Sequence, residues 1–236
     1  MTMPRATIVV PAFDERENIG SFLARIEEAV SLPVEIFIVV DSPDDATLLG
    51  VKEHQSDRFD IRALISELPK GPANAIRYGI SKANADVIVI TMADGSDDPS
   101  TIDSLVRLVE RGCAIAAASR YMPGGQQVGG PRHKRILSKV ASQILRVALG
   151  IGTHDSTNSY KAYSKVFLDD VGIQSDKGFE LGLELIAKAH RRGYMIAEIP
   201  TIWIDRSQGK SNFQLRRWLP QYLRWFFYAF GPKATK

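Results

Sequence analysis

A run of β-branched residues followed at once by a cluster of acids constrains the fold of this chain more than any other feature. Residues 87–91 read Val-Ile-Val-Ile-Thr, which is typical of a strand buried on both faces at the centre of a parallel sheet. Asp94, Asp97 and Asp98 follow closely, around Gly95. Open α/β sheets bind their ligands beyond the carboxyl ends of such strands. The stretch therefore predicts a central strand that delivers three carboxylates to a ligand site.

The acidic loop, residues 94–98, has the chemistry of a divalent cation site. Carboxylate and hydroxyl oxygens suit Mg²⁺ or Mn²⁺, and these ions keep open positions for substrate phosphates. We therefore expect the loop to hold a metal ion together with a diphosphate. The same letters, Asp-Gly-Ser-Asp-Asp-Pro, also make a good turn and a good helix start, so a plain polar loop stays open as the alternative.

Strands and helices alternate along the first 119 residues, which is the pattern of a mostly parallel, Rossmann-like α/β sheet flanked by helices. Three of the strands end in loops that carry aspartate. The first strand is not followed by Gly-x-Gly-x-x-Gly, and the chain has no Walker-type phosphate loop, so a metal is the expected device for binding phosphates. Strands are expected at 6–10, 34–40, 61–66, 87–91 and 114–119, and helices at 18–30, at 73–83 and after Pro99.

Composition is that of an ordinary globular protein with one large core. Of the 236 residues, 44% are hydrophobic and 24% are charged. The single Cys113 cannot form an internal disulfide, which fits a reducing compartment. The chain shows no secretory signal before the strand at 6–10 and no apolar stretch long enough to span a bilayer. We therefore expect a cytoplasmic protein.

Charge is distributed unequally between the two halves of the chain. Residues 1–119 hold 11 basic and 19 acidic residues, whereas residues 120–236 hold 19 basic and 8 acidic ones. A basic second half predicts an anionic partner, for which nucleic acid and an anionic membrane surface are the candidates. The aromatic residues of the C-terminus favour the membrane, so we expect a peripheral protein on the cytoplasmic face and no nucleic-acid partner.

A basic amphipathic helix is expected to begin at Pro131. Its cationic residues favour contact with phosphate groups, although a solvated surface helix has the same pattern. Its apolar residues recur at helical spacing and predict one face buried against something apolar. The cationic residues are Arg132, His133, Lys134, Arg135, Lys139 and Arg146, and the apolar ones are Ile136, Leu137, Val140, Ile144, Leu145 and Ala148.

The C-terminal segment, residues 215–230, combines seven aromatic residues with arginines. Such a segment suits the headgroup region of a bilayer, and this is the interpretation we favour. Packing of the aromatic rings on the core or on a second subunit, as in a homodimer, is the alternative. Between the basic helix and this segment the sequence predicts a polar loop at 155–159, a short strand at 160–163, a helix at 179–191, strand segments at 194–199 and 201–204, and a donor-rich loop at 205–212.

Taken together, these segments resemble the dolichol-phosphate mannosyltransferase branch of the family-two inverting glycosyltransferases, which have the GT-A fold. Two departures stand out: Met92 replaces the first aspartate of the usual Asp-Ala-Asp, and the segment 41–47 is shortened. The matching segments follow the order of the family over nearly the whole chain: 9–19, 41–44, 70–75, the acidic loop, 119–121, 135–138, 155–163, 190–194 and 205–211.

The resemblance implies an enzyme that moves a hexose, mannose or glucose, from a GDP- or UDP-hexose to a polyprenyl phosphate, with Mg²⁺ or Mn²⁺ as cofactor. It also implies a loop, 205–212, that closes over the reacting groups. By the same resemblance the catalytic residues are Asp94, Arg120 and Arg206, and the metal ligands are Asp94 and Ser96. Asp97 and Asp98 stay open as further metal ligands or as the cap of the next helix. The donor is bound by Pro11, Phe13, Glu15, Asp41 and Lys70, and the acceptor phosphate by Arg120, Lys134, Arg135, Ser138 and Arg206.

These segments predict a catalytic domain at 1–212 and an amphipathic helix at 213–236. Within the domain, 1–119 is the donor and metal half and 120–212 the acceptor half. Two other functions stay open. A glycosyltransferase with a soluble or protein acceptor would need a general base, and a nucleotide-sugar binding module with weakened catalysis is suggested by Met92. The candidate bases are Asp97, Asp98, Glu180 and Glu184.

Overall fold

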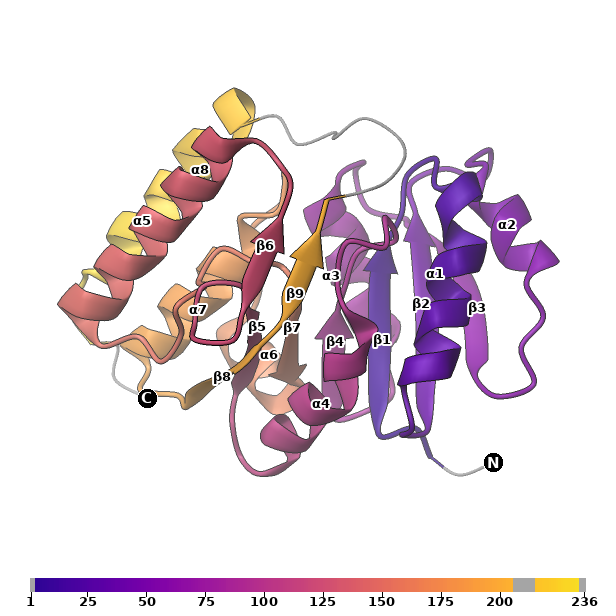
Figure 1. The fold of residues 1–236 in the computed structure, drawn as a ribbon, viewed down its shortest axis with the longest axis horizontal. Helices are drawn as coiled ribbons and strands as arrows, with labels where there is room; N and C mark the ends of the chain where they lie inside the picture. Colours follow the sequence, from indigo (N-terminus) through magenta and orange to yellow (C-terminus); the bar gives the residue numbers. More distant parts are fainter. Residues whose placement is uncertain (1–2, 206–214, 234–236) are drawn as a thin grey trace.

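One seven-stranded sheet runs through the molecule, and the computed structural model describes residues 3–205 and 215–233 of the chain (Figure 1). The strands are β1 (Ala6–Pro11), β2 (Val34–Val40), β3 (Asp60–Ile65), β4 (Val87–Ile90), β5 (Ile115–Ser119), β6 (Gln126–Val128), β7 (Lys161–Ser164), β8 (Ile196–Pro200) and β9 (Ile202–Ile204). The helices are α1 (Arg16–Ala29), α2 (Thr47–Glu53), α3 (Pro72–Lys82), the short 3₁₀ turn η1 (Pro99–Thr101), α4 (Ile102–Glu110), α5 (Arg132–Leu149), α6 (Lys165–Val171), α7 (Leu181–Arg191) and α8 (Leu215–Ala229).

The strand order in the sheet is β3-β2-β1-β4-β7-β5-β8. Strand β7 pairs antiparallel with both of its neighbours, and the other pairs are parallel. The predicted α/β class and the five strands of the first half are confirmed. The sequence did not indicate that β7 enters between β4 and β5, nor did it predict α2, α6 or the small second sheet of β6 and β9.

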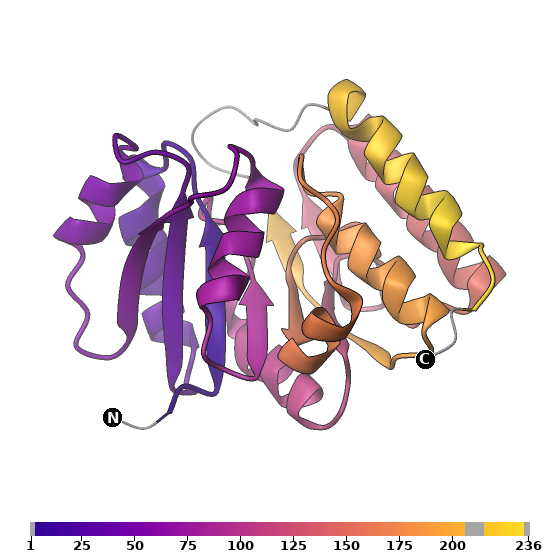
Figure 2. The ribbon, with the colours of Figure 1, turned by 180° about the vertical axis from the view of Figure 1, so that it is seen from behind.

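Apolar runs explain the central strands, because each is covered on both faces. Every residue of β2, β4 and β5 is buried, as expected for strands between two helical layers. Helices α1 and α4 pack their apolar residues on one face, and α3 and α7 pack theirs on the other (Figures 1 and 2). The two layers hold the carboxyl ends of the parallel strands at one edge of the sheet.

Neighbouring strands bring the predicted donor and metal segments together at this edge. Strand β1 lies between β2 and β4, and the three run parallel. The loops that follow them carry Phe13 and Glu15, Asp41, and Asp94, respectively. Because parallel neighbours end at the same edge, these loops are adjacent in space although they are far apart in sequence.

Helices α5 and α8 lie side by side at the end of the molecule beyond the sheet (Figures 1 and 2). The prediction was that the apolar face of α5 is buried against something apolar, and the protein itself buries only Leu145 of this face. Within residues 3–205 and 215–233, four residues of the face are exposed: Ile136, Leu137, Val140 and Ile144. Ala148, the sixth residue of the predicted face, is exposed as well.

The aromatic residues of α8 divide between the protein and the outside. Trp225 is 2% exposed and packs in the core with α7, whereas Phe227 is 65% exposed. Packing on the core, the alternative interpretation of the C-terminal segment, is therefore confirmed for one side of the helix, whereas the other side leaves aromatic rings exposed. Within residues 3–205 and 215–233, no helix combines the length and the apolar character that crossing a bilayer requires.

The contact between α3 and the sheet generates a prediction about two glycines. A Cβ atom on Gly79 would lie 2.5 Å from Cγ1 of Val9, so Gly79→Ala should lower the free energy of unfolding by about 1–3 kcal/mol through overpacking. A Cβ atom on Gly20 of α1 would meet nothing within 4 Å, so Gly20→Ala should raise it by about 0.5–1 kcal/mol. Urea unfolding measures both changes, and a Gly79→Ala variant as stable as Gly20→Ala would contradict this packing.

Candidate functional site

The acidic loop forms a tight turn directly after β4. Gly95 has a φ of +71°, and the Asp94 carboxylate accepts a hydrogen bond from the backbone N–H of Ser96 at 3.0 Å. Ser96 is buried, and its hydroxyl oxygen has no hydrogen-bond partner in the part of the chain that the structure describes. A buried hydroxyl without a partner is costly unless a ligand completes it. The turn therefore presents a carboxylate and a hydroxyl beside each other as two oxygen ligands.

The other two aspartates of the loop have different roles. Asp97 is buried and turns back toward β4, where it accepts hydrogen bonds from the Thr91 hydroxyl at 2.9 Å and the Met92 N–H at 3.3 Å. Burial, assisted by the nearby charge of Asp94, raises the pKa of Asp97 to about 7. Asp98 caps the following turn by accepting the Ser100 N–H at 3.0 Å. Asp97 is therefore a buried neighbour of Asp94, and Asp98 is the cap of η1.

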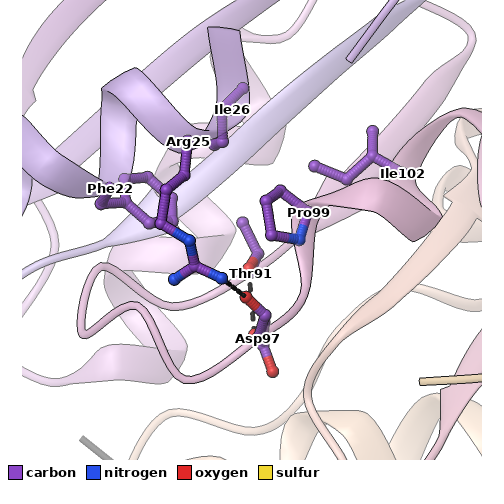
Figure 3. Close-up of a pocket in the computed structure, with 7 residues that line it drawn as sticks. All are labelled: Phe22, Arg25, Ile26, Thr91, Asp97, Pro99 and Ile102. Carbon is purple, nitrogen blue, oxygen red and sulfur yellow. Dashed lines mark hydrogen bonds between the residues drawn. The ribbon is translucent and has the colours of Figure 1, made fainter. Parts of the chain in front are cut away.

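Arg25 holds the acidic loop from the side of α1, and sequence analysis missed it. Its guanidinium donates hydrogen bonds to the carbonyl oxygens of Gly95 at 2.6 Å and Asp97 at 3.2 Å. Figure 3 shows Arg25 reaching toward Asp97 across a small crevice lined by side chains of α1 and of the segment after β4. The periodicity of α1 places Arg25 on its polar face, and no local signal indicates a partner 70 positions away.

Met92 does not supply a metal ligand, and its side chain packs against the apolar core under α3 and α7. Residues 3–205 and 215–233 contain no group of three or more His, Cys, Asp or Glu side chains that could hold a metal. An ion at this site would have Asp94 and Ser96 as ligands and would take its other ligands from a bound diphosphate and water. Such a sparse set of oxygen ligands fits Mg²⁺ or Mn²⁺, which protein sites commonly hold with one or two carboxylates plus phosphates.

Asp41, at the end of β2, is the most constrained of the predicted donor-binding residues. Its Oδ2 atom accepts the Gly71 N–H at 2.9 Å, which ties it to the loop that carries Lys70. Its Oδ1 atom is buried and has no partner among the described residues. Burial raises the pKa of Asp41, and the positive charge of Lys70 partly opposes this. An acceptor oxygen is therefore available to a ligand at this edge.

The loop after β1 supplies the other predicted donor-binding residues. Phe13 is 60% exposed, and Lys70 is exposed across the same edge. Pro11 is half-buried at the end of β1. Glu15 is fixed by its backbone N–H, which donates to the Thr47 hydroxyl at 2.9 Å. The structure thus brings together all five residues predicted for the donor, on three adjacent loops.

Arg120, the first residue after β5, is held by a buried carboxylate. Its Nε, Nη2 and backbone N–H groups donate to Asp155 at 2.7, 3.0 and 3.1 Å. Burial alone would raise the pKa of Asp155, but the Arg120 charge lowers it below its usual value. Arg120 is also close enough to Asp97 to oppose the rise in that residue's pKa. The predicted acceptor side and the acidic loop are therefore neighbours.

A cluster of hydroxyl groups surrounds Ser138 on α5. The Ser138 hydroxyl lies 3.0 Å from the Tyr121 hydroxyl and 2.5 Å from that of Thr157. Burial raises the pKa of Tyr121, and the charges of Arg120 and Arg135 oppose this, so both arginines lie close enough to act on the cluster. Sequence analysis missed Tyr121 and Thr157 as members of the site, although both lie in the segments that carry the family resemblance.

The remaining predicted acceptor residues are Lys134 and Arg206. Lys134 is half-buried on the first turn of α5, next to Arg135. Arg206 and the loop residues 206–212 lie outside the described residues. The last strand before them reaches the acidic loop, because the Ile204 N–H donates to the Ser96 carbonyl oxygen at 3.0 Å.

Two of the candidate general bases have carboxylates that already accept hydrogen bonds from the protein itself. Glu184 forms an ion pair with Lys188 at 2.6 Å and accepts the backbone N–H groups of Gln174 and Ser175. Glu180 is buried and accepts the N–H groups of Lys177 and Gly178. Each carboxylate ties the chain before α7 to the helix, which explains their one-turn spacing without catalysis.

Lys161, on β7, is a buried cation that sequence analysis did not single out. Its amino group donates to the carbonyl oxygens of Ser156 and Asn158, within the loop that carries Asp155. Burial lowers the pKa of Lys161 to about 7, although the charge of Asp155 opposes the shift. An uncharged amine still has two hydrogens, which is enough for both carbonyls.

The low pKa of Lys161 generates a prediction about stability and pH. An unfolded lysine keeps its proton up to its ordinary pKa of 10.5, so between about pH 7 and 10 the unfolded chain binds more protons than the folded one. The free energy of unfolding should therefore rise with pH over this window in the wild type, and Lys161→Met should lose this part of the rise. Denaturant unfolding at a series of pH values measures it, with Lys165→Met on α6 as control. Parallel curves for wild type and Lys161→Met would contradict the assignment.

Curated relatives and solved structures resemble this chain over most of its length. A polyprenol monophosphomannose synthase of Mycolicibacterium smegmatis is 29% identical over 88% of this chain and 80% of its own length. A dolichol-phosphate mannosyltransferase of Pyrococcus furiosus is 26% identical over 94% of this chain and 64% of its own length. These two relatives agree with the branch that the sequence motifs indicated.

The solved structures that resemble it share the fold at low identity. A mycobacterial protein superposes with a TM-score of 0.73 at 16% identity, over 98% of this chain and 76% of its own. Glucosyl-3-phosphoglycerate synthase from Mycobacterium tuberculosis, solved with Mn²⁺, UDP and glucosyl-3-phosphoglycerate, superposes with a TM-score of 0.70 at 17% identity, over 98% of this chain and 82% of its own. The family model described as glycosyl transferase family 2 matches residues 7–172, more than half of the sequence, and the chain therefore belongs to glycosyl transferase family 2.

Proposed function

We propose that this glycosyltransferase moves a hexose, mannose or glucose, from a GDP- or UDP-sugar to a polyprenyl phosphate at a membrane surface, with inversion at the anomeric carbon. The observation that carries the proposal is the closeness of two groups of opposite character: the acidic loop with Asp94 and Ser96, and Arg120 held by Asp155. One side suits a metal-bound diphosphate and the other an acceptor phosphate. The names of the two mannosyltransferase relatives support the same substrates.

On the donor side, the described residues bind and orient the nucleotide sugar. The available Oδ1 of Asp41 accepts a hydrogen bond from the base, and Phe13 offers an exposed ring beside it. Lys70 places a positive charge near the diphosphate. A divalent ion bound by Asp94 and Ser96 would neutralise the charge that develops on the leaving diphosphate. Arg25 keeps the loop in the shape that presents these two ligands.

On the acceptor side, the chain positions one anion beside another. A phosphate oxygen of the lipid attacks the anomeric carbon, the bond from that carbon to the diphosphate breaks, and the nucleoside diphosphate leaves with the electron pair. The nucleophile is already ionised at neutral pH, so no general base is needed. This agrees with the structural bonds of Asp98, Glu180 and Glu184. Arg120, Lys134, Arg135 and Arg206 supply positive charge for the phosphate, and Ser138 a hydroxyl.

The surface formed by α5 and α8 is the side on which we propose that the membrane lies. We call it the α5/α8 surface, and it carries cations of α5 around its apolar groups, which suits an anionic bilayer. In this arrangement residues 1–212 form the catalytic domain, with donor and acceptor halves, and 213–236 the segment, containing α8, that rests on the lipid. The exposed apolar side chains of the α5/α8 surface are Ile136, Leu137, Val140, Ile144, Val147, Leu223, Phe227 and Phe230.

A soluble acceptor is the second candidate, and one observation favours it. Asp97 lies beside Asp94 and Arg120, and its pKa of about 7 is suited to removing a proton from a hydroxyl group. The similar fold of a synthase solved with glucosyl-3-phosphoglycerate and UDP is consistent with such a reaction. An enzyme of this kind would not need the exposed apolar residues of the α5/α8 surface.

The metal assignment predicts the behaviour of two matched variants. Asp94→Asn should abolish the part of nucleotide affinity that depends on Mn²⁺, because the loop loses its charged ligand. Asp98→Asn, four positions on, is the control. Asparagine caps a helix as well as aspartate does, so this variant keeps the cap and should bind the nucleotide with normal affinity. Calorimetric titration of GDP and UDP with and without Mn²⁺ measures this. An unchanged metal dependence in Asp94→Asn would refute the site.

The membrane assignment predicts a loss of binding when the α5/α8 surface becomes polar. A Val147→Ser/Phe227→Ser variant should bind anionic vesicles at least roughly 100-fold more weakly, because each buried apolar side chain contributes about 1.5 kcal/mol or more. Val166→Ser on α6, where the valine is 74% exposed, is the control. Vesicle flotation measures binding. The contrary outcome is a double variant that floats as the wild type does but is monomeric where the wild type is a dimer. In that case the surface pairs two copies of the chain instead of binding lipid.

A further inference from the structure

Residues 174–180, which we call the bridging segment, lie between the donor side and the C-terminal helix. The segment follows α6 and leads into α7, on the face of the sheet that α3 covers (Figure 2). On one side it contacts Gly71 and the first turn of α3, and on the other it contacts α8. It therefore joins two parts of the molecule that are far apart in the sequence.

Asn74, in the first turn of α3, makes the contact on the donor side. Its side chain is buried, and its amide group donates to the carbonyl oxygens of Pro69 at 2.9 Å and Asp176 at 3.2 Å. Its Oδ1 atom accepts a hydrogen bond from Arg77 at 3.0 Å. One side chain thus fastens both ends of the contact, the donor loop before α3 and the bridging segment.

Gly71 adds a direct backbone contact at the same place. It has a φ of +142°, and a Cβ atom there would lie 2.9 Å from the Lys177 carbonyl oxygen. The Gly71 N–H is the group that donates to Asp41. The position of the bridging segment therefore limits where Gly71 lies, and Gly71 in turn sets the orientation of the Asp41 carboxylate.

The opposite side of the bridging segment is covered by α8. The indole N–H of Trp225 donates to the Ser175 hydroxyl at 3.1 Å, and Trp225 is almost fully buried. Trp218 packs its ring against Gly178 and lies edge-on to Phe179, with ring centres 5.6 Å apart. The buried side of α8 is thus in contact with the same segment that supports the donor loop.

The bridging segment is fixed by its own backbone bonds. Glu184 accepts the N–H groups of Gln174 and Ser175, and Glu180 accepts those of Lys177 and Gly178. With these donors bonded, the segment transmits a displacement at one end to the other instead of absorbing it.

We infer that Asn74 and Ser175 are positioning residues of the donor site and that α8 supports nucleotide binding through them, in addition to its place at the membrane. The inference rests on the proposed function in taking Asp41 as a donor-binding residue. Seating α8 through Trp225 holds the bridging segment, the segment holds Asn74 and Gly71, and these hold Asp41. A nucleotide is then bound well only when α8 is in place.

Amide hydrogen exchange tests this link in the ligand-free protein. Trp225→Phe keeps an aromatic ring but removes the indole N–H, and Ser175→Ala removes its acceptor. Both variants should speed exchange at the Gly71 amide several-fold or more. Tyr228→Phe is the control, because it removes a hydroxyl from the same helix at a place where the ring faces Arg191. It should leave exchange at Gly71 unchanged. Unchanged exchange at Gly71 in both Trp225→Phe and Ser175→Ala would overturn the inference.

Nucleotide binding tests the consequence for the site. With Mn²⁺, the Kd and the donor KM should rise about three- to ten-fold in Trp225→Phe, the size expected for losing one hydrogen bond. They should rise at least as much in Asn74→Ser, which loses more than one hydrogen bond, whereas kcat and the acceptor KM stay unchanged in both variants. Asn84→Ala, just beyond the other end of α3 where the asparagine is exposed, is the control. Normal nucleotide binding in both Trp225→Phe and Asn74→Ser would overturn this inference but leave the proposed function standing. A wild type that binds neither GDP nor UDP overturns the proposed function, whatever the exchange rates show.

Discussion

The buried ion pair of Arg120 and Asp155 is the interaction on which the arrangement of the site depends. Asp155 is fully buried and accepts three hydrogen bonds from Arg120, one of them from its backbone, so the end of β5 and the loop before β7 cannot separate. Breaking such a pair by removing one partner costs about 3–5 kcal/mol, because the other charge stays buried. The pair fixes a guanidinium beside the acidic loop, and Lys161 fixes the loop that supplies Asp155.

The placement of the proposed donor residues at one edge of the sheet could be predicted from sequence because its determinants are local. Strand β4 is a continuous apolar run, and β1 and β2 are apolar except for Thr7 and Glu35. A parallel sheet places the loops after these strands at one edge. Asp41 and Asp94 therefore come together for reasons that each segment carries in its own residues. The capping role of Asp98 was equally readable from Asp-Pro before an apolar helix, although sequence alone could not separate it from a metal ligand.

The other features of the fold and the site could not be predicted, because they depend on which segments, distant in the sequence, meet in space. The contacts of Arg25 with Gly95 and of Arg120 with Asp155 span 70 and 35 positions, and periodicity shows only that these arginines are polar. Strand β7 was expected as a strand, but its antiparallel place between β4 and β5 has no local signature. The apolar residues of α5 show the same limit: helical spacing indicates a face, but not whether the protein or something else covers it.

A polyprenyl phosphate and a soluble acceptor would use the same donor side, and they differ only in how the protein binds the acceptor. The direct measurement is a competition in which the enzyme receives a nucleotide sugar, Mn²⁺, and equal amounts of a polyprenyl phosphate in vesicles and of 3-phosphoglycerate, with products identified by mass spectrometry and their anomeric configuration by NMR. The account predicts a glycosylated polyprenyl phosphate of inverted configuration. Glycosylated phosphoglycerate, or a lipid product with retained configuration, would contradict it.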